Sequence, residues 1–385
     1  MAHVLCAWGY AMIEGSHSIK RLLAAMAQLD ASDLHIKVGM PPIYRVGGHL
    51  KRVNTDPLAE DEADHMLDPL IDEKQRERFV EHGALDFAAH LDNGERFRVN
   101  MFLAGGHVHA AIRRVKAEIP TYASLHLPKV YSQIVDLTHE GLVIVCGVTG
   151  SGKSTTLAAM IDHVNSVRDV NIITIEDPVE FRFTPKKAVI SQRELGIDVH
   201  SFAEAMRSAV RQDPDVIFIG EMRDKHTMLA AIQAAETGHL VFATLHTADT
   251  MQSFGRILEF FPPEERQFIR MSLSNSLRAI CAQRLLPALE DFESSTVPAT
   301  EVLLMNPSVR EAIREGHDED LPSILNGSKA DGMRSFTDSL VELVEKEAVN
   351  KSTAMEFAPN REALESRLKG VEVKATSMVG RIRKS

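Results

Sequence analysis

The chain has 385 residues, 44% hydrophobic and 25% charged, which is ordinary for a globular protein of about two domains. Its formal net charge of -11 argues against a dominant nucleic-acid surface, because such a surface needs a basic face. Three scattered cysteines, Cys6, Cys146 and Cys281, suit a reducing compartment and exclude a four-cysteine zinc module. No apolar run reaches membrane-spanning length, and the start of the chain lacks a signal-peptide pattern.

The first part of the chain predicts a small domain of helices and hairpins. Its periodicity indicates a helix over Glu60–His82 that ends at a glycine. The strand predicted over Glu95–Phe102 alternates apolar and polar residues, so one face is core and the other carries Arg96 and Arg98. A further strand is predicted over Val108–Val115.

The second part predicts a mostly parallel sheet covered by helices. Residues 116–140 contain two prolines and no sustained periodicity before Val130, which indicates a linker. From Gly141 onward strands alternate with helices. A long helix is predicted from Pro262 to Pro287, and the basic, aperiodic stretch after Lys369 indicates a solvated terminus.

An apolar strand, a glycine-rich turn and a helix start follow one another between Gly141 and Thr156 and fill the pattern G-x-x-x-x-G-K-[ST]. Glycines let backbone amides approach phosphate oxygens, and the helix N-terminus adds partial positive charge. The lysine should reach the β- and γ-phosphates and the serine hydroxyl should bind Mg²⁺. We therefore expect ATP at Gly147, Val148, Thr149, Gly150, Ser151, Gly152, Lys153, Ser154 and Thr155.

Acidic residues follow two other predicted strands of this sheet. Because the carboxyl ends of parallel strands meet at one edge, we expect these residues near the bound phosphates. Glu180 and Glu221 are the candidates for orienting the attacking water. No aspartate stands directly before Glu221, so metal binding should depend on Ser154 with Glu176, Asp177 or Glu221.

Two histidines flank a further predicted strand, with His239 before it and His246 after it. They are expected either to contact the γ-phosphate or to couple subunits, and a structural role for one of them stays open. A zinc site is not expected, because no cysteine is near them in the sequence.

Together these segments resemble the secretion-superfamily hexameric ATPases of the type IV pilus, and above all the PilT/PilU retraction type of twitching motility. The matching segments are Ala31–His35, Arg96–Asn100, Gly147–Ala159, Thr174–Phe181, Asp213–Asp224, Ala235–Phe242 and Thr244–Thr247.

The resemblance implies an α/β fold, with a RecA-like P-loop NTPase domain preceded by a smaller α+β PAS-like domain. It implies that Lys153, Glu180 and Glu221 are catalytic, and that arginines of the amino domain matching Arg96, Arg98 and Arg113 lie near the nucleotide. The expected limits are an extension over 1–18, the PAS-like domain over 19–115, the linker over 116–140, the ATPase domain over 141–350 and a tail over 351–385.

The implied function is a hexameric motor that hydrolyses ATP with Mg²⁺ and powers pilus retraction at the cytoplasmic face of the inner membrane. The expected partners are other copies of the chain, the pilus inner-membrane platform protein and paralogous pilus ATPases. Nucleic acid is not expected, and membrane contact is expected only through partners. The alternatives are an accessory PilU-like retraction ATPase, an extension or type II secretion ATPase, a non-hydrolysing regulatory subunit and, less favoured, a DNA-translocating ring.

The segment Ser308–Glu315 resembles the retraction motif Ala-Ile-Arg-Asn-Leu-Ile-Arg-Glu, but its first two residues and its centre differ. It keeps Arg310 and Arg314, which are four residues apart and therefore predicted on one helix face. We expect this pair to couple hydrolysis to the pilus, although a solvated face or a local ion pair stays open. The altered centre leaves the PilU-like alternative open.

Overall fold

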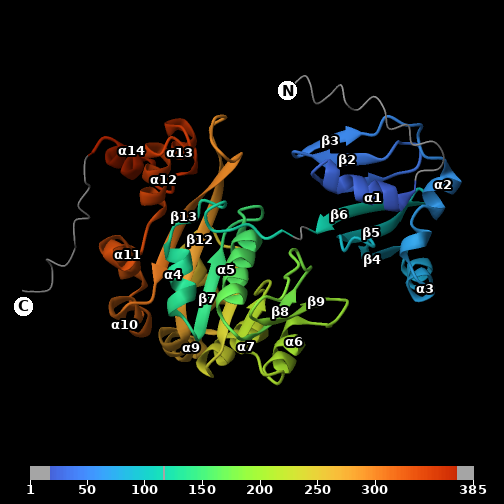
Figure 1. The fold of residues 1–385 in the computed structure, drawn as a ribbon. Coiled ribbons are helices and arrows are strands. Elements are labelled where there is room, and N and C mark those ends of the chain that lie inside the picture. The colour runs from blue at the N-terminus through green and yellow to red at the C-terminus, as the bar shows by residue number, and fades with distance from the viewer. Residues whose placement is uncertain (1–17, 116–117, 371–385) are drawn as a thin grey trace, which may run out of the picture. The chain divides into compact units, whose positions relative to one another are not determined.

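The computed structural model describes residues 18–115 and 118–370, and Figure 1 draws its helices and strands. The chain divides into two compact units between Ala117 and Glu118. Within the described ranges, no helix is both long enough and apolar enough to cross a bilayer.

The amino-terminal unit is an antiparallel sheet with helices packed on one face. Its helices are α1 (Ile19–Gln28), α2 (Glu60–His65) and α3 (Glu73–His82), with a 3-10 turn, η2 (Asp68–Leu70), between the last two. Its strands are β1 (Ala31–Ile36), β2 (Ile43–Val46), β3 (His49–Arg52), β4 (Ala84–His90), β5 (Arg96–Ala104) and β6 (His107–Val115). The spatial order is β3-β2-β1-β6-β5-β4, and every neighbouring pair is antiparallel.

The alternation predicted for β5 sets the two faces of this sheet. Phe97, Val99 and Met101 are buried and pack with the apolar face of α1. Arg98 points to the opposite face, directly across from Arg113 on β6. The helices and the core therefore lie on one side, and the other side carries arginines.

The carboxyl-terminal unit is built on a seven-stranded sheet in the order β13-β12-β7-β11-β10-β8-β9. All neighbouring strands are parallel except β12 and β13. The strands are β7 (Gly141–Cys146), β8 (Asn171–Glu176), β9 (Val189–Glu194), β10 (Val216–Ile219), β11 (Leu240–Leu245), β12 (Leu277–Pro287) and β13 (Thr296–Leu304). All six residues of the central strand β7 are buried, as expected of a strand covered on both faces.

Helices cover both faces of this sheet (Figure 1). On one face α4 (Val130–Leu137) and α5 (Lys153–Val167) share an apolar core with the strands. The second core lies on the other face, where the remaining helices pack. These are α6 (Phe202–Ala209), α7 (Lys225–Glu236), α8 (Thr250–Glu259), α9 (Pro263–Ser276), α10 (Pro307–Glu315), α11 (Leu321–Gly327), α12 (Phe336–Glu345), α13 (Lys351–Phe357) and α14 (Arg361–Leu368). The predicted fold class, an α/β P-loop domain after a smaller α+β domain, is confirmed.

The single helix predicted over Glu60–His82 is wrong, because the structure divides it into α2, η2 and α3. Pro69 lies in the short 3-10 turn, where it cannot continue an α-helix. A new helix then starts at Asp72, whose carboxylate accepts from the Gln75 amide while the Gln75 side chain accepts from the Asp72 amide. This reciprocal cap fixes the start of α3.

The long helix predicted from Pro262 to Pro287 is also wrong in its second half. Helix α9 ends at Ser276, and Leu277–Pro287 forms β12 between β7 and β13. A strand buried on both faces carries an almost continuous apolar run without alternation, so its sequence does not distinguish it from a buried helix.

Two segments differ from their predicted roles as linker and tail. Residues 130–137 of the predicted linker form α4, whose Tyr131 and Ile134 join the core on one face of the sheet. Within the predicted tail, α13 and α14 bury Ala354 and Leu364 in the other core. These helices have only seven or eight residues each, so they depend on packing against the sheet rather than on their own helix propensity. The predicted extension and the last basic stretch lie outside the described residues, except Ser18, Lys369 and Gly370.

Candidate active site

The turn from β7 into α5 has the backbone conformation that its glycines allow. Gly150 and Gly152 have φ angles of 80° and 86°, which side-chain-bearing residues rarely adopt. A Cβ atom at Gly147 would collide with the Ser151 hydroxyl and the Gln283 carbonyl. The loop therefore closes tightly on itself at the N-terminus of α5, which is the geometry of a phosphate cradle.

Lys153 lies along this loop. Its Nζ donates to the carbonyl oxygens of Gly147 at 2.8 Å and Val148 at 3.1 Å. Burial lowers the pKa of the Lys153 ammonium, while the nearby Cys146, Glu221 and Glu180 act in the opposite direction. Neutral carbonyls therefore hold the ammonium next to the loop. Among the described residues, no carboxylate lies as close to it as these two carbonyl oxygens.

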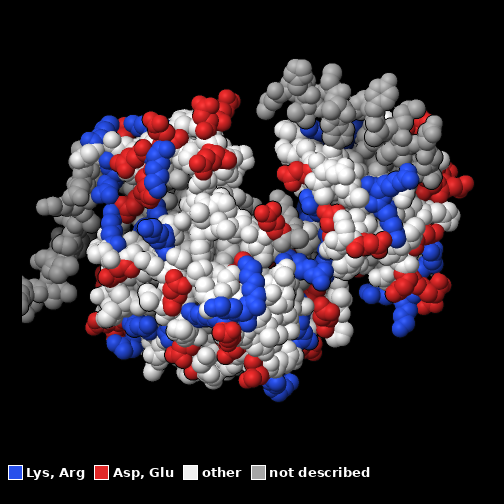
Figure 2. Space-filling view, in the orientation of Figure 1, with Lys and Arg blue, Asp and Glu red and all other residues white. Residues whose placement is uncertain are grey.

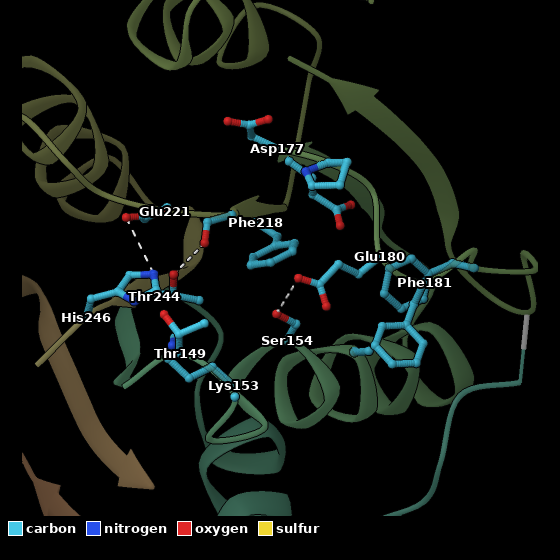
Figure 3. A pocket seen from close by; sticks show the side chains of 16 residues that line it. Thr149, Lys153, Ser154, Asp177, Glu180, Phe181, Phe218, Glu221, Thr244 and His246 are labelled. Atoms are coloured by element: carbon cyan, nitrogen blue, oxygen red, sulfur yellow. Dashed lines mark hydrogen bonds and ion pairs between the residues drawn. The ribbon is translucent and has the colours of Figure 1, made fainter. Parts of the chain in front are cut away.

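A pocket opens beside the loop, lined by the polar ends of neighbouring strands and by aromatic rings (Figure 3). Its lining residues are Thr149, Gly150, Lys153, Ser154, Ala158, Glu176, Asp177, Pro178, Glu180, Phe181, Phe183, Phe218, Gly220, Glu221, Thr244 and His246. They come from the carboxyl ends of β7, β8, β10 and β11, so the predicted convergence at one sheet edge is present.

Glu180 and Ser154 meet across this pocket. The Ser154 hydroxyl donates to the Glu180 carboxylate at 3.0 Å, as Figure 3 shows. The residue predicted to bind the metal and one predicted to orient water are therefore direct neighbours.

Glu221 holds two cationic or potentially cationic partners. Its carboxylate lies 2.6 Å from Arg223 Nη2 and 3.5 Å from His246 Nε2. Burial raises the pKa of Glu221, but the Arg223 hydrogen bond and the charges of His246, Arg223 and Lys153 outweigh it and lower the pKa below its usual value. Glu221 is thus a carboxylate anion at neutral pH. Burial, followed by the charge of Lys153, lowers the pKa of His246 and favours neutral imidazole.

The side chains of Glu176 and Asp177 do not face Ser154, with which they were predicted to bind the metal. The buried Glu176 carboxyl accepts from Thr174 Oγ1 at 2.6 Å and from Gln192 Nε2 at 3.2 Å. Burial raises the pKa of Glu176 to about 7, so the carboxyl is partly protonated near neutrality. Asp177 is exposed, and Figure 3 shows its carboxylate at the rim, turned away from Ser154. Glu180 is the carboxylate that faces Ser154 instead.

His239 does not join this pocket, which corrects the grouping of the two histidines. It precedes β11, and its carbonyl accepts from the amide of Gly141, the first residue of β7. It therefore lies at the amino edge of the parallel sheet, a full strand length from His246. Its Nδ1 hydrogen-bonds the Ala234 carbonyl at 2.9 Å, which closes the end of α7.

The predicted arginines belong to the amino-terminal unit. Arg113 Nε donates to Asp33 at 2.9 Å although its side chain is 71% exposed, and Arg98 lies 3.9 Å from Asp86. Arg96 pairs with Val115 where β5 begins and β6 ends. Arg98 and Arg113 share a sheet face, whereas none of the three lines the pocket that the carboxyl-terminal unit forms by itself.

Two residues in direct contact with this site were missed by the sequence interpretation. Arg223 pairs with Glu221, and its signal was the i, i+2 spacing after a strand, which places both side chains on one side. Gln283 contacts the P-loop from β12, and its signal was the polar pair Gln283-Arg284 between apolar residues. Assigning this segment to a helix concealed it.

A glycine loop between a central parallel strand and a helix, with Lys153, Ser154 and acidic residues at adjacent strand ends, defines a P-loop NTPase domain of the RecA-like class. The family model described as "Type II/IV secretion system protein" matches residues 89–356. The chain belongs to this family.

Individual relatives and a solved structure also resemble the chain over most of its length. The chain is 39% identical to the type IV pilus retraction ATPase PilT of Pseudomonas aeruginosa, over 88% of this chain and 98% of PilT. It is 37% identical to the type IV pilus ATPase PilU of the same organism, over 91% of each chain. A crystal structure of the pilus retraction motor PilT with bound ADP superposes with a TM-score of 0.85 at 38% identity, covering 91% of this chain and 99% of that one. The resemblance found in the sequence, including its assignment to an ATPase family, is confirmed.

Proposed function

We propose that this chain is an ATP-hydrolysing motor of type IV pilus retraction that works as a homohexamer. The observation that carries the proposal is the pocket in which Lys153, Ser154, Glu180 and Glu221 converge at one sheet edge. It occurs in a chain that matches nearly the whole length of a relative named for pilus retraction.

The P-loop of this chain binds the phosphates. Its amides and the α5 N-terminus supply partial positive charge, and Lys153 adds a full charge at the β- and γ-phosphates. The ammonium needs only to exchange two neutral carbonyl acceptors for phosphate oxygens. No buried ion pair has to break for this exchange, so the lysine is held ready without being neutralised.

Glu221, which also lines the pocket, orients the attacking water. Because its pKa is lowered, it is an anion that can accept a hydrogen bond from water at neutral pH. Arg223 and His246 hold its two oxygens from different sides. As negative charge develops on the transferred phosphoryl group, the Arg223 guanidinium also stabilises it from the Glu221 side.

The donor groups at Ser154 fit a magnesium ion. A hydroxyl and a carboxylate lie together there, both being oxygen ligands that Mg²⁺ accepts. Within residues 18–115 and 118–370, no three His, Cys, Asp or Glu side chains form a group that holds a metal alone. This suits an ion bound through Ser154, Glu180, waters and substrate phosphates. When bound, the ion would offset the negative charge of the substrate phosphates.

Several copies are needed because the positive charge that completes each pocket comes from a neighbouring copy. Arg96, Arg98 and Arg113 extend from a sheet of the amino-terminal unit, and domain closure brings them to the nucleotide bound by the next copy. Repeated closure around a ring drives depolymerisation of the pilus. The motor acts at the cytoplasmic face of the inner membrane, where the pilus platform protein and paralogous ATPases hold it.

The test combines hydrolysis and motility. Purified protein should hydrolyse ATP without DNA, Lys153→Ala should abolish turnover, and the wild-type chain should restore twitching to a strain lacking its retraction motor. Turnover of Lys153→Ala within a few-fold of wild type would refute the P-loop assignment.

The second candidate is an accessory PilU-like ATPase, which is favoured by the altered centre of Ser308–Glu315 and by the identity of 37% to PilU. This candidate predicts that the chain restores twitching only when a second retraction motor is present.

A further inference from the structure

Gln283 is a buried amide that none of the roles above includes. It lies on β12, directly beside the strand β7 that leads into the P-loop, and only 3% of it is exposed. The last paired residues of the two strands are Ala282 and Cys146. Gln283 is the next residue on β12 and therefore lies beside the start of the P-loop.

Both polar ends of the Gln283 side chain bind the P-loop. Its Nε2 donates to the Ser151 carbonyl at 2.7 Å, and its Oε1 accepts from Thr156 Oγ1 at 2.8 Å. Ser151 and Thr156 stand on either side of Lys153 and Ser154 in the sequence. One side chain thus joins the end of the loop to the first turn of α5.

The glycines of the loop also fit closely against Gln283. A Cβ atom at Gly147 would lie 2.5 Å from the Gln283 carbonyl oxygen, and one at Gly152 would lie 2.7 Å from Gln283 Nε2. These distances are shorter than any real Cβ contact. Two P-loop glycines are therefore required by the approach of Gln283 as well as by the approach of phosphate.

The neighbouring residue keeps β12 in this register. The guanidinium of Arg284 donates to the Phe357 carbonyl at 2.7 Å and stacks over the Phe336 ring at 4.4 Å on the other side of the strand. The side chains of Gln283 and Arg284 thus anchor β12 to the P-loop on one side and to α12 and α13 on the other.

A neutral amide suits this place better than a charged group. An amide offers one donor and one acceptor, and here both are used. A glutamate would set a second oxygen against the Ser151 carbonyl and bring negative charge toward the phosphates.

We propose that Gln283 is a positioning residue that holds the P-loop in its phosphate-binding conformation without touching the substrate. The inference rests on the proposed function only in taking a nucleoside phosphate as the ligand. Without Gln283, the Ser151 peptide can rotate, and the loop amides together with Lys153 lose their fixed directions.

The test uses full-length Gln283→Met, which keeps an unbranched side chain of similar length and removes both hydrogen bonds. We expect ADP affinity to fall about tenfold and kcat/KM for ATP to fall by at least as much. The reason is that the variant leaves buried polar groups of the P-loop unpaired, and one such group lowers a binding constant by about tenfold. In the nucleotide-free protein, hydrogen exchange in the peptide covering 147–156 should become about tenfold faster. Thr156→Val removes one of the two bonds and tests the same inference if Gln283→Met does not fold.

Thr300→Val is the matched control. Thr300 pairs with Gln283 across β12 and β13, is 1% exposed, and its hydroxyl has no partner among the residues described. It should leave ADP affinity and loop exchange within about twofold of wild type. Wild-type values in Gln283→Met, or equal losses in Thr300→Val, would overturn the inference. Failure of the wild-type protein to bind ADP would overturn the proposed function instead.

Discussion

Replacing Arg310 and Arg314 one at a time should have different effects on stability, because both lie on α10 but they contact different groups. The half-buried Arg310 donates through Nη1 to the carbonyl oxygens of Ser274 and Asn275 in the last turn of α9. Arg314 is exposed and pairs with Glu315 at 3.4 Å. The structure therefore predicts that Arg310→Ala destabilises the carboxyl-terminal unit and that Arg314→Ala does not.

The magnitude follows from what Arg310 binds. A hydrogen bond from a charged donor contributes about 1.5–3 kcal/mol, and a cation at a helix C-terminus about 0.3–1 kcal/mol. Burial lowers the pKa of Arg310, and the nearby Arg278 lowers it further, so like-charge repulsion offsets part of this gain. We expect Arg310→Ala to cost about 2 kcal/mol, or a Tm lower by about 4–8 °C for a unit of this size. For Arg314→Ala we expect at most about 0.5 kcal/mol.

Thermal unfolding of the two single variants, followed by circular dichroism at one ionic strength, measures this difference. Equal Tm values for Arg310→Ala and Arg314→Ala would refute the capping role of Arg310. The result also decides how pilus coupling is tested. Loss of twitching in Arg310→Ala would reflect lost stability, so the coupling hypothesis has to be tested with Arg314→Ala, which should keep its ATPase rate.

Three further predictions concern the pocket. Glu221→Gln should lower kcat about a hundredfold and leave ADP affinity within a few-fold; lost binding with an unchanged rate would make Glu221 structural. Because burial raises the pKa of Glu176 to about 7 from 4.5, the folded state keeps a proton that the unfolded chain releases. Wild type should therefore lose up to about 3 kcal/mol relative to Glu176→Gln between pH 4.5 and 7, and urea unfolding showing parallel pH curves would contradict this. Finally, specific ATPase activity should rise with protein concentration if neighbours complete each site, whereas constant activity in a monomeric sample would argue against shared sites.

The sequence predicted the P-loop well because its signal is local. The strand, the glycines and the lysine are consecutive, and each type is required by backbone geometry or charge. Glu180, Glu221 and His246 were predicted to converge for a more general reason, since the carboxyl ends of parallel strands share one edge. The same rule excludes His239, which stands before its strand rather than after it.

Other features depend on tertiary neighbours that no local pattern reveals. The raised pKa of Glu176 depends on its burial beside Gln192, which lies on the unpredicted strand β9. The contact of Gln283 with Ser151 joins residues 132 positions apart. It required that Leu277–Pro287 be a strand, which its apolar run alone does not decide.

The hydrogen bond from Arg284 to the Phe357 carbonyl limits where the chain can be shortened. A cut at residue 350 would remove the carbonyl that accepts from Arg284, together with Ala354 and Leu364, which are fully buried. It would also strip Arg367 from Asp338 on α12. The exposed apolar surface would invite aggregation, and β12 would lose an anchor within one residue of the P-loop contact. Any shortened form of this protein, or any fusion at this end, therefore has to keep α13 and α14.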